Sequence, residues 1–541
     1  MNNFCNKYIP VALLMCISLN SCGQPGSKQK SPDIPEKNWN ASIPGSFTDQ
    51  DELSFDSVEI NNFFKNHPQV KGVQNDVVEF YSSRNYAYAW FDNGKLIEQA
   101  GNLFNRIINL ENEGLSAKIP YQKTLDSLFN LPETAHQKKP DILLELLLTS
   151  DYFVFSKLSW EGMDESVSES LKWHLPRKKV NYEHYLDSLL KNPDRNALPK
   201  EPVYRQYDLL KTYLKKYKDL ERREAWTTLS PEQKQIRPGD SSVFIAQLKK
   251  RLYLLEDYQG DTSSRFYDKG LSDALKIYQQ RNGLTVDGQI GAETLSSINV
   301  PLKTRIRQII ANMERNRWLP ISSHKDVLAV NIPDFKLHVF HADSLLWSCK
   351  VVVGQSTHPT TVFYGDLEYV VFRPYWNVPE SIVKNELLPE MRKSANYLAA
   401  HDMEITGYRN SLPVIRQQPG PNNSLGLVKF LFPNSYNTYL HDTPAKSLFG
   451  ETSRAFSHGC IRVEEPVKLA NFLLKYQPEW SPEKINSAMQ NGNERFVKLK
   501  NTVPVYIAYF TAFVSQDQKL NFRKDIYNLD EHLANMILED R

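Results

Sequence analysis

The chain has little cysteine: its 541 residues contain five, at positions 5, 16, 22, 349 and 460. The first three lie in or at the end of an apolar N-terminal segment, so only Cys349 and Cys460 belong to the body of the chain. Two cysteines make no disulfide framework. A bridge between them would leave Cys460, which lies in a motif described below, without a free thiol. Cys349 lies in a β-branched run, 348–353, which favours a small buried hydrophobic residue.

The sequence also lacks a strong charge of either sign. Lysine and arginine number 65, aspartate and glutamate 63, and the net charge is +2. A nucleic-acid-binding protein usually concentrates basic residues on one face, whereas here they are spread among acidic ones, which excludes nucleic acid as the expected partner. Long hydrophobic runs are scarce too. The longest internal one, 142–155, contains Glu145 and Asp151, and two carboxylates in so short a stretch favour a buried core helix over a membrane span.

The N-terminus has the pattern of a targeting segment. Lys7 precedes apolar residues 9–19, a stretch shorter than the ~20 residues of a membrane-spanning helix. The end of this segment, Leu19-Asn20-Ser21-Cys22, resembles a bacterial lipobox, in which Cys22 becomes the lipidated first residue of the mature protein. An ordinary cleaved secretory signal is the alternative. Either interpretation predicts an exported protein with a signal over 1–22, followed by a flexible tether over 23–50 that is rich in proline, glycine, serine and lysine.

The rest of the chain shows three kinds of periodicity, so we expect a multidomain α+β protein. Residues 51–237 follow mainly helical spacing and predict a helical scaffold. Residues 238–300 predict a small three-helix module, with apolar positions of its first helix at Val243, Phe244, Leu248, Leu252 and Leu255. We expect a linker helix over 301–324, a mainly-β domain over 325–514 with a lid insertion near 384–420, and a C-terminal tail over 515–541.

One short motif in the β-rich domain points to chemistry. Ser457-His458-Gly459-Cys460-Ile461-Arg462 follows Tyr439-Leu440-His441-Asp442, and His441 and Cys460 are 19 residues apart. Cysteine attacks carbonyls as the thiolate, and a histidine within hydrogen-bond reach removes its proton and later protonates the leaving amine. That separation is too large for one helical turn, but a strand bearing His441 can lie beside a turn bearing Cys460. A zinc site at Cys460, His441 and His458 is the weaker alternative because no C-x-x-C companion is present.

These motifs resemble those of a known family. The S-x-G-C run resembles the nucleophile turn of L,D-transpeptidases with a YkuD-type catalytic domain, and Y-L-H-D-T-P resembles the histidine segment of their long, multidomain subfamily. The stretch 278–295, Y-Q-Q-R-N-G-L-T-V-D-G-Q-I-G-A-E-T-L, resembles the peptidoglycan-binding domain 1 family. The module either binds peptidoglycan or only packs, having lost its ligand groove. The resemblance implies a helical scaffold domain before that module and a mainly-β catalytic domain after it.

The resemblance also implies roles for the motif residues. His441 would be the base, with its ring oriented by the backbone carbonyl of Asp442; the Asp442 carboxylate is the rival orienter. Gly459 allows the tight turn that would aim its own N–H and that of Cys460 at the oxyanion of the tetrahedral intermediate. Ser457 and His458, beside the nucleophile, are expected among the substrate-binding residues, and His458 is expected to brace the turn rather than act as the base.

Four further residues have a binding and a structural interpretation each. Tyr439 would donate its hydroxyl to the oxyanion or pack in the core, and Arg462 would hold a substrate carboxylate or form a structural ion pair. Trp376 and Asn377, in a W-N-V-P segment, would line the substrate groove, or the tryptophan would cap the sheet. The lid is shorter here than in many long relatives, so the resemblance alone does not predict that the lid encloses the substrate.

The expected activity is that of a peptidoglycan L,D-transpeptidase, which builds cell wall and cell shape. Cys460 would take the acyl group of a tetrapeptide stem, release D-alanine and pass the acyl group to a side-chain amine of a second stem, a 3→3 cross-link. An L,D-carboxypeptidase, a hydrolase of protein-to-wall links, and a non-catalytic wall-binding scaffold are the alternatives. No cofactor or metal is implied, and we expect a monomer that contacts peptidoglycan stem peptides and is held to a bacterial membrane, in the periplasm, by a lipid on Cys22.

Overall fold

The computed structural model describes residues 53–92, 94–129, 140–191, 201–233, 235–320, 325–342 and 344–539. The predicted signal segment, Cys22 and the tether at 23–50 lie outside these residues. In the described part of the chain, no helix has the length and apolar content needed to cross a bilayer.

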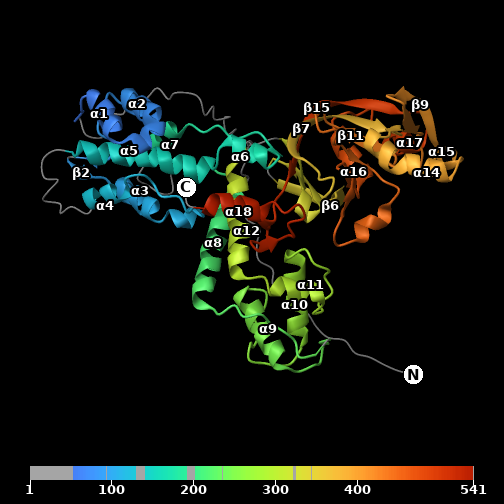
Figure 1. Ribbon diagram of the computed structural model, residues 1–541, viewed down its shortest axis with the longest axis horizontal. Helices are drawn as coiled ribbons and strands as arrows, with labels where there is room; N and C mark the ends of the chain where they lie inside the picture. The colour runs from blue at the N-terminus through green and yellow to red at the C-terminus, as the bar shows by residue number, and fades with distance from the viewer. Residues whose placement is uncertain are drawn as a thin grey trace, which may run out of the picture. The chain divides into compact units, whose positions relative to one another are not determined.

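The N-terminal region is helical (Figure 1). Its helices are α1 (Val58–Asn66), α2 (Gln74–Ser83), α3 (Glu98–Ile108), α4 (Gln122–Phe129), α5 (Ile142–Ser156), α6 (Glu165–Ser170), α7 (Tyr182–Lys191) and α8 (Arg205–Arg223), with a small hairpin of β1 (Phe91–Asp92) and β2 (Lys95–Leu96). The shorter turns are η1 (Pro68–Val73), η2 (Leu110–Glu113) and the π-helix η4 (Lys157–Glu161).

Helix α5 is the buried core helix that its two carboxylates favoured. It begins at an Asp141 cap, whose side chain accepts the N–H groups of Leu143 and Leu144. Glu145 lies fully buried and accepts hydrogen bonds from the N–H groups of Ala89 and Trp90, at 2.6 and 3.1 Å. A buried carboxylate is tolerated when such donors satisfy it. Burial raises the pKa of the second carboxylate, Asp151, well above its ordinary value.

The three-helix module consists of α9 (Val243–Leu254), α10 (Lys269–Arg281) and α11 (Ala292–Ile298), packed around a core of its own (Figure 1). The sequence placed Val243 on the core face of α9, but Val243 is exposed because it is the first residue of the helix, directly after the Ser242 cap. Phe244, Leu248 and Leu252 are buried as predicted.

Helix α12 (Leu302–Arg317) occupies the predicted linker segment, but it is buried along most of its length. Its buried side chains include polar and charged ones, and these carry hydrogen bonds to neighbouring elements: Gln308 to the carbonyls of Thr511 and Arg523, and Arg315 to Asp530 at 2.6 Å. A helix with so polar a sequence resembles a solvated linker, and the partners that satisfy it come from far along the chain.

The catalytic region is a sheet that closes on itself. Its strands are β4 (Asp326–Asn331), β5 (Lys336–His341), β6 (Ser344–Gly354), β7 (Val362–Phe372), β11 (Val428–Leu431), β12 (Leu440–His441), β14 (Ile461–Val463) and β15 (Arg495–Ala508). They pair in the order β11-β12-β14-β6-β5-β4-β15-β7, and β7 pairs in turn with β11. The closure makes a barrel-like core, with α16 (Pro466–Leu474) and α17 (Pro482–Gln490) also in this region.

One strand of this sheet comes from the scaffold region. In β3 (Trp173–His174), Trp173 and His174 pair in parallel with Val362 and Phe363, at the start of β7. Strand β11 covers only the far end of β7, residues 369–372, so β3 extends the sheet where β11 does not reach. Trp173 is buried against Trp318 and Phe510, with ring centroids 5.5 and 5.8 Å apart.

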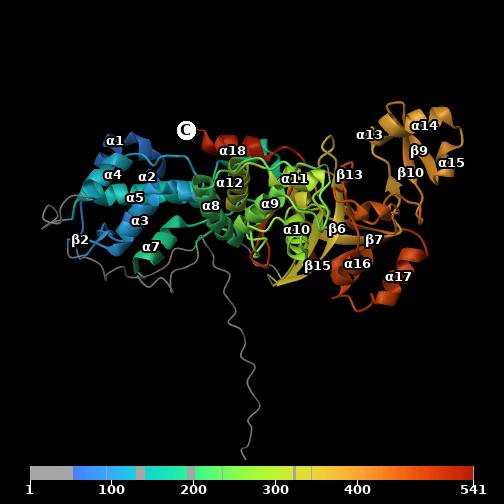
Figure 2. The same ribbon diagram turned by 90° about the horizontal axis from the view of Figure 1, so that it is seen from below.

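The lid folds as a unit with its own small core (Figure 2). Strand β8 (Trp376–Asn377) pairs with β10 (Leu412–Gln417), which pairs with β9 (Met403–Arg409). Between β8 and β9 lie α13 (Glu380–Ile382), η6 (Val383–Leu387), α14 (Leu388–Lys393) and α15 (Tyr397–Ala400). The folded unit therefore begins at Trp376, before the expected start near 384, because β8 is one of its strands.

The C-terminal segment closes the described chain with β16 (Ala512–Val514), β17 (Leu520–Phe522) and α18 (Asp530–Leu538). Short elements beside the catalytic sheet are η5 (Ile332–Asp334), η7 (Lys446–Gly450) and β13 (Ala455–Ser457), which pairs with β6.

Candidate active site

His441 lies on strand β12, and Cys460 lies in the turn that leads into the adjacent strand β14. Strands β12 and β14 run parallel, with Leu440 opposite Ile461 and His441 opposite Arg462. Cys460 directly precedes β14, so the histidine strand lies beside the cysteine turn, as the spacing allowed. Leu440 and Ile461 are fully buried, and this apolar pair fixes the backbone next to His441 and Cys460 in the core.

The turn that carries Cys460 is held by its own serine. Ser457 Oγ donates to the carbonyl of Cys460 at 2.5 Å and accepts the N–H of Gly459 at 3.2 Å. Gly459 adopts φ +112°, a backbone conformation that favours glycine. The sequence suggested two oxyanion donors, but here the Gly459 N–H already has an acceptor. Within the described residues, the N–H of Cys460 donates to no acceptor, so it is the donor left for a substrate.

The thiol of Cys460 lies in a partly buried site. Its Sγ is 3.6 Å from the carbonyl oxygen of Asn437, to which it donates. Burial raises the pKa of Cys460, while hydrogen bonds from the backbone and hydroxyl of Tyr439 and the positive charge of Arg462 act in the opposite direction. Burial outweighs them, so the resting cysteine is a neutral thiol.

His441 is buried and fixed in one tautomer. Its Nδ1–H donates to the backbone carbonyl of Asp442 at 2.5 Å, which leaves Nε2 as the proton acceptor. Burial, followed by the charge of Arg462, lowers its pKa to about 4, against the hydrogen bonds that the ring makes with the backbone of Asp442 and Leu425 and the charge of Asp442. The imidazole is therefore neutral near pH 7.

The carboxylate of Asp442 has other partners. Oδ2 accepts the N–H of Leu427 at 2.9 Å, and Oδ1 accepts from Lys446 Nζ at 2.5 Å. A Cβ on Gly426 would lie 2.4 Å from this carboxylate, so the close approach requires glycine there. Of the two orienting groups considered for His441, the hydrogen bond belongs to the backbone carbonyl.

Tyr439, Arg462 and His458 surround this pair in different ways. The Tyr439 ring meets His441 edge-on, at 5.7 Å, and its hydroxyl faces the sulfur of Cys460. Arg462 is half-buried, and its Nε is buried without a hydrogen-bond partner among the described residues. His458 points to the lid, where its Nε2 is 2.8 Å from Glu386 Oε1 of η6.

The two proposed groove residues belong to the lid. Trp376 is half-buried against the lid core, and Asn377 is exposed in β8. Trp376 thus packs in the lid rather than on the catalytic sheet, and the lid side chain that reaches the nucleophile turn is that of Glu386.

Sequence reasoning missed several contributors. Asn437 supplies the carbonyl beside the thiol from a left-handed conformation, φ +54°, which asparagine adopts more readily than most residues. Thr360 Oγ1 donates to the carbonyl of Gly459 at 2.8 Å. The Asn437 position carried a weak signal, an asparagine before a strand; Thr360 and Glu386 carried none, because their contacts depend on the tertiary fold.

The comparisons with known proteins agree with this geometry. Residues 325–507 match the family model described as the L,D-transpeptidase catalytic domain, YkuD. Residues 75–214 match the scaffold domain, and residues 241–298 match the model printed as "Putative peptidoglycan binding domain". These three segments are thus similar to an L,D-transpeptidase catalytic domain of the YkuD type, a scaffold domain and a peptidoglycan-binding domain, which agrees with the resemblance seen in the sequence.

A curated relative comes from Haemophilus influenzae and is named "Putative L,D-transpeptidase". It is 31% identical over 242 residues, which cover 42% of this chain and 49% of the relative. The chain therefore spans about half the length of the curated relative that it matches.

Solved structures of L,D-transpeptidases are more distant. That from Stackebrandtia nassauensis is 14% identical, with a TM-score of 0.22, and covers 52% of this chain and 97% of its own. That from Mycobacterium smegmatis is 13% identical, with a TM-score of 0.19, and covers 34% and 58%.

Proposed function

We propose that the protein is a peptidoglycan L,D-transpeptidase with Cys460 as nucleophile and His441 as base. The observation that carries this proposal is that His441 lies on β12 and Cys460 directly precedes the paired strand β14, in a segment that matches the L,D-transpeptidase catalytic domain. The donor would be a tetrapeptide stem and the acceptor the side-chain amine of a second stem. The match to a peptidoglycan-binding domain at 241–298 supports the same polymer as substrate.

The acylation step follows from the neutral thiol–imidazole pair. As Sγ of Cys460 bonds to the carbonyl carbon of the stem, the thiol proton moves to Nε2 of His441. The resulting oxyanion accepts a hydrogen bond from the Cys460 N–H, with the Tyr439 hydroxyl as second donor. The C–N bond then breaks, the imidazolium protonates the nitrogen of the departing D-alanine, and a thioester remains on Cys460.

Transfer reverses these proton movements. The acceptor amine attacks the thioester carbonyl, and His441 Nε2 takes the proton that the amine loses. The C–S bond breaks, the new amide leaves as the cross-link, and the sulfur recovers its proton from the imidazolium. Asp442 acts through its backbone carbonyl, which keeps a proton on Nδ1, so that Nε2 is the nitrogen that takes up and gives back the proton in each step. Arg462 would hold a carboxylate of the stem with its guanidinium, whose Nε has no partner of its own in the described structure.

Release of D-alanine tests the proposal. With tetrapeptide muropeptides as substrate, Cys460→Ala is expected to abolish release without unfolding the protein, because only the sulfur is removed. Cys349→Ala is the matched control: Cys349 is buried on β6, and burial raises its pKa to about 12, so it should be dispensable for chemistry. Undiminished release by Cys460→Ala would refute the proposal.

The products separate transfer from hydrolysis, which uses the same residues. Mass spectrometry of cross-linked dimers indicates a transpeptidase, whereas monomeric tripeptides indicate an L,D-carboxypeptidase. A wall-binding scaffold would form no covalent adduct with a carbapenem, whereas an acylable Cys460 would. For the exported, lipid-anchored location we keep Cys22 as the proposed anchor, tested by loss of membrane association in Cys22→Ala.

A further inference from the structure

The Gly459–Cys460 peptide group is held from its carbonyl side. Thr360 Oγ1 donates to the carbonyl oxygen of Gly459 at 2.8 Å. In a trans peptide the C=O and the following N–H point in opposite directions. A hydrogen bond that fixes the Gly459 carbonyl therefore also fixes the direction of the Cys460 N–H, the donor left for an oxyanion.

The hydroxyl of Thr360 is itself oriented. It accepts the N–H of Gly354 at 2.9 Å, so its single proton is directed to Gly459. A Cβ on Gly354 would lie 2.2 Å from the carbonyl of His358, because the loop 355–360 folds back over this glycine. The loop thus carries Thr360 to the nucleophile turn.

Both ends of this loop are held by one residue of the C-terminal segment. Tyr527 Oη donates to the carbonyl of Gly354 at 2.6 Å and accepts the N–H of Thr360 at 3.1 Å. Tyr527 lies 20 residues beyond the matched catalytic segment, which ends at 507. A single hydroxyl with one donor and one acceptor bond spans the loop, so removal of that oxygen would release both ends.

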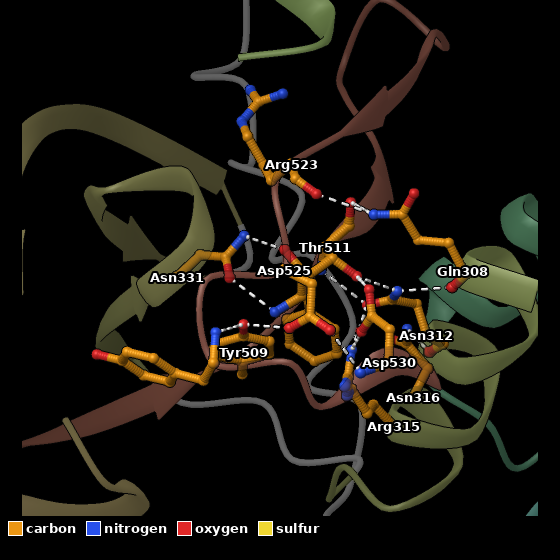
Figure 3. Close-up of polar contacts among 12 residues, drawn as sticks. Gln308, Asn312, Arg315, Asn316, Asn331, Tyr509, Thr511, Arg523, Asp525 and Asp530 are labelled. Carbon is orange, nitrogen blue, oxygen red and sulfur yellow. Dashed lines mark hydrogen bonds and ion pairs between the residues drawn. The ribbon is translucent and has the colours of Figure 1, made fainter. Parts of the chain in front are cut away.

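Tyr527 contacts a polar network that reaches α12, and Figure 3 shows the part of this network from Tyr509 to Arg315. The Tyr527 ring stacks on Tyr509, with centroids 5.4 Å apart, and its N–H donates to Tyr509 Oη. Tyr509 donates to Asp525, which accepts the N–H of Asp530 at 2.7 Å. Asp530 also accepts from Thr511 and Arg315, so the network joins the tail to helix α12.

We infer that Tyr527 is a positioning residue for acylation: through Thr360 it sets the direction of the Cys460 N–H. The inference rests on the proposed acyl-transfer function of Cys460. Tyr527 touches no reacting atom. Its contribution is to keep an oxyanion donor aligned, and loss of such a donor costs about 10²–10³ in rate.

The test compares two reactions of the same sulfur in the full chain. Acylation by p-nitrophenyl acetate passes through an oxyanion, whereas alkylation by iodoacetamide does not. We expect Tyr527→Phe and Thr360→Val to slow the acylation burst by about 10- to 100-fold, with alkylation within about twofold of the wild-type rate. Thr360→Ser keeps the hydroxyl and should restore the burst. Tyr476→Phe, at an exposed tyrosine of the catalytic region, is the matched control.

The outcomes are separable. An unchanged burst in Tyr527→Phe, or equal losses of acylation and alkylation, would overturn the inference, since the second result indicates general loosening of the turn. A wild-type protein that is acylated but releases no D-alanine from muropeptides would refute the proposed function and leave the positioning role to be judged on the burst. If wild-type Cys460 is not acylated at all, the proposed function and the positioning role of Tyr527 are both refuted. With muropeptides, the same variants should lower kcat at unchanged KM.

Discussion

The neutral state of His441 has a consequence for stability. Its pKa is lowered from 6.5 to about 4 in the folded protein, chiefly by burial. A base whose folded pKa is depressed contributes stability that is present above its unfolded pKa and is lost as the pH falls through the folded value. The loss therefore falls between pH 6.5 and about 4, and the difference corresponds to about 3 kcal/mol.

His441→Gln should remove that part of the pH dependence. We expect the difference in unfolding free energy between wild type and variant to change by about 3 kcal/mol from pH 7 to pH 4, in the direction that favours the variant in acid. Urea denaturation at a series of pH values measures it. The control is His458→Gln, at an exposed ring. Parallel pH curves for wild type and His441→Gln would contradict the argument.

Burial raises the pKa of Cys460, and the hydrogen bonds of Tyr439 and the charge of Arg462 lower it. Arg462→Gln removes the positive charge that lowers the pKa of Cys460, so that pKa should rise further. Iodoacetamide alkylation as a function of pH is expected to have its midpoint at higher pH than in wild type. Arg222→Gln changes an exposed arginine of α8 and should leave the profile in place. A shift to lower pH would mean that Arg462 does not act on the sulfur electrostatically.

At the scale of single residues, much of the candidate site could be proposed from the sequence. The motif residues Cys460 and His441 and the backbone carbonyl of Asp442 could be identified because their chemistry depends on residue type and short spacing. The direction of each N–H could not: Ser457 occupies the Gly459 amide through a side-chain rotamer that no pattern specifies.

At the scale of elements, the lid contacts the candidate site through an ion pair. Its own core holds β8, η6 and β10 together, and Glu386 of η6 pairs with His458 at 2.8 Å. Both side chains are partly exposed, and such pairs contribute only roughly 0.2–1 kcal/mol. The pair is therefore a weak latch between the lid and the nucleophile turn.

Glu386→Gln should loosen this latch. We expect amide hydrogen exchange in residues 380–393 to rise by about two- to fivefold, in line with the small energy of such a pair, and exchange in β4 to β6 to stay unchanged. Glu390→Gln is the matched control, because Glu390 pairs with Lys393 inside the lid, at 2.7 Å. Equal exchange in wild type and Glu386→Gln would show that the contact does not hold the lid.

The sequence predicted a lid insertion in this segment but not the sheet that the lid contains. Met403 and its neighbours in β9 are only partly buried, so they lack the alternation that marks a half-buried strand. The sequence predicted a helix at α12 but not its burial, because its polar residues have partners more than 150 positions away.

For the whole molecule, the scaffold strand β3 joins two regions into one sheet. Trp173→Ala would leave a cavity beside Trp318 and Phe510, and such truncations cost about 3–5 kcal/mol. We expect a lower midpoint of thermal unfolding for both the scaffold and the catalytic region. Calorimetry measures the unfolding of both regions, and the catalytic region is also followed by the point at which alkylation is no longer specific for Cys460. His174→Ala removes only a stack on Tyr436, with centroids 5.2 Å apart, and should change stability by less than about 1 kcal/mol. Loss of stability confined to the scaffold would contradict a shared sheet.

The domain order followed from periodicity and motifs, and the family models agree with it. A two-residue strand such as β3 gives no periodic signal, so its place in the catalytic sheet could not be predicted.

The segment that matches the catalytic-domain family, 325–507, does not contain every residue that supports the candidate site. A recombination event at residues 325 and 507 would transfer Cys460 and His441 to a new gene and leave behind β3, which extends the sheet, and Tyr527, which spans the loop of Thr360. A host protein would have to replace both before the transferred cysteine had the surroundings that it has here. Inheritance of this chemistry is therefore expected to involve the flanking regions together with the barrel.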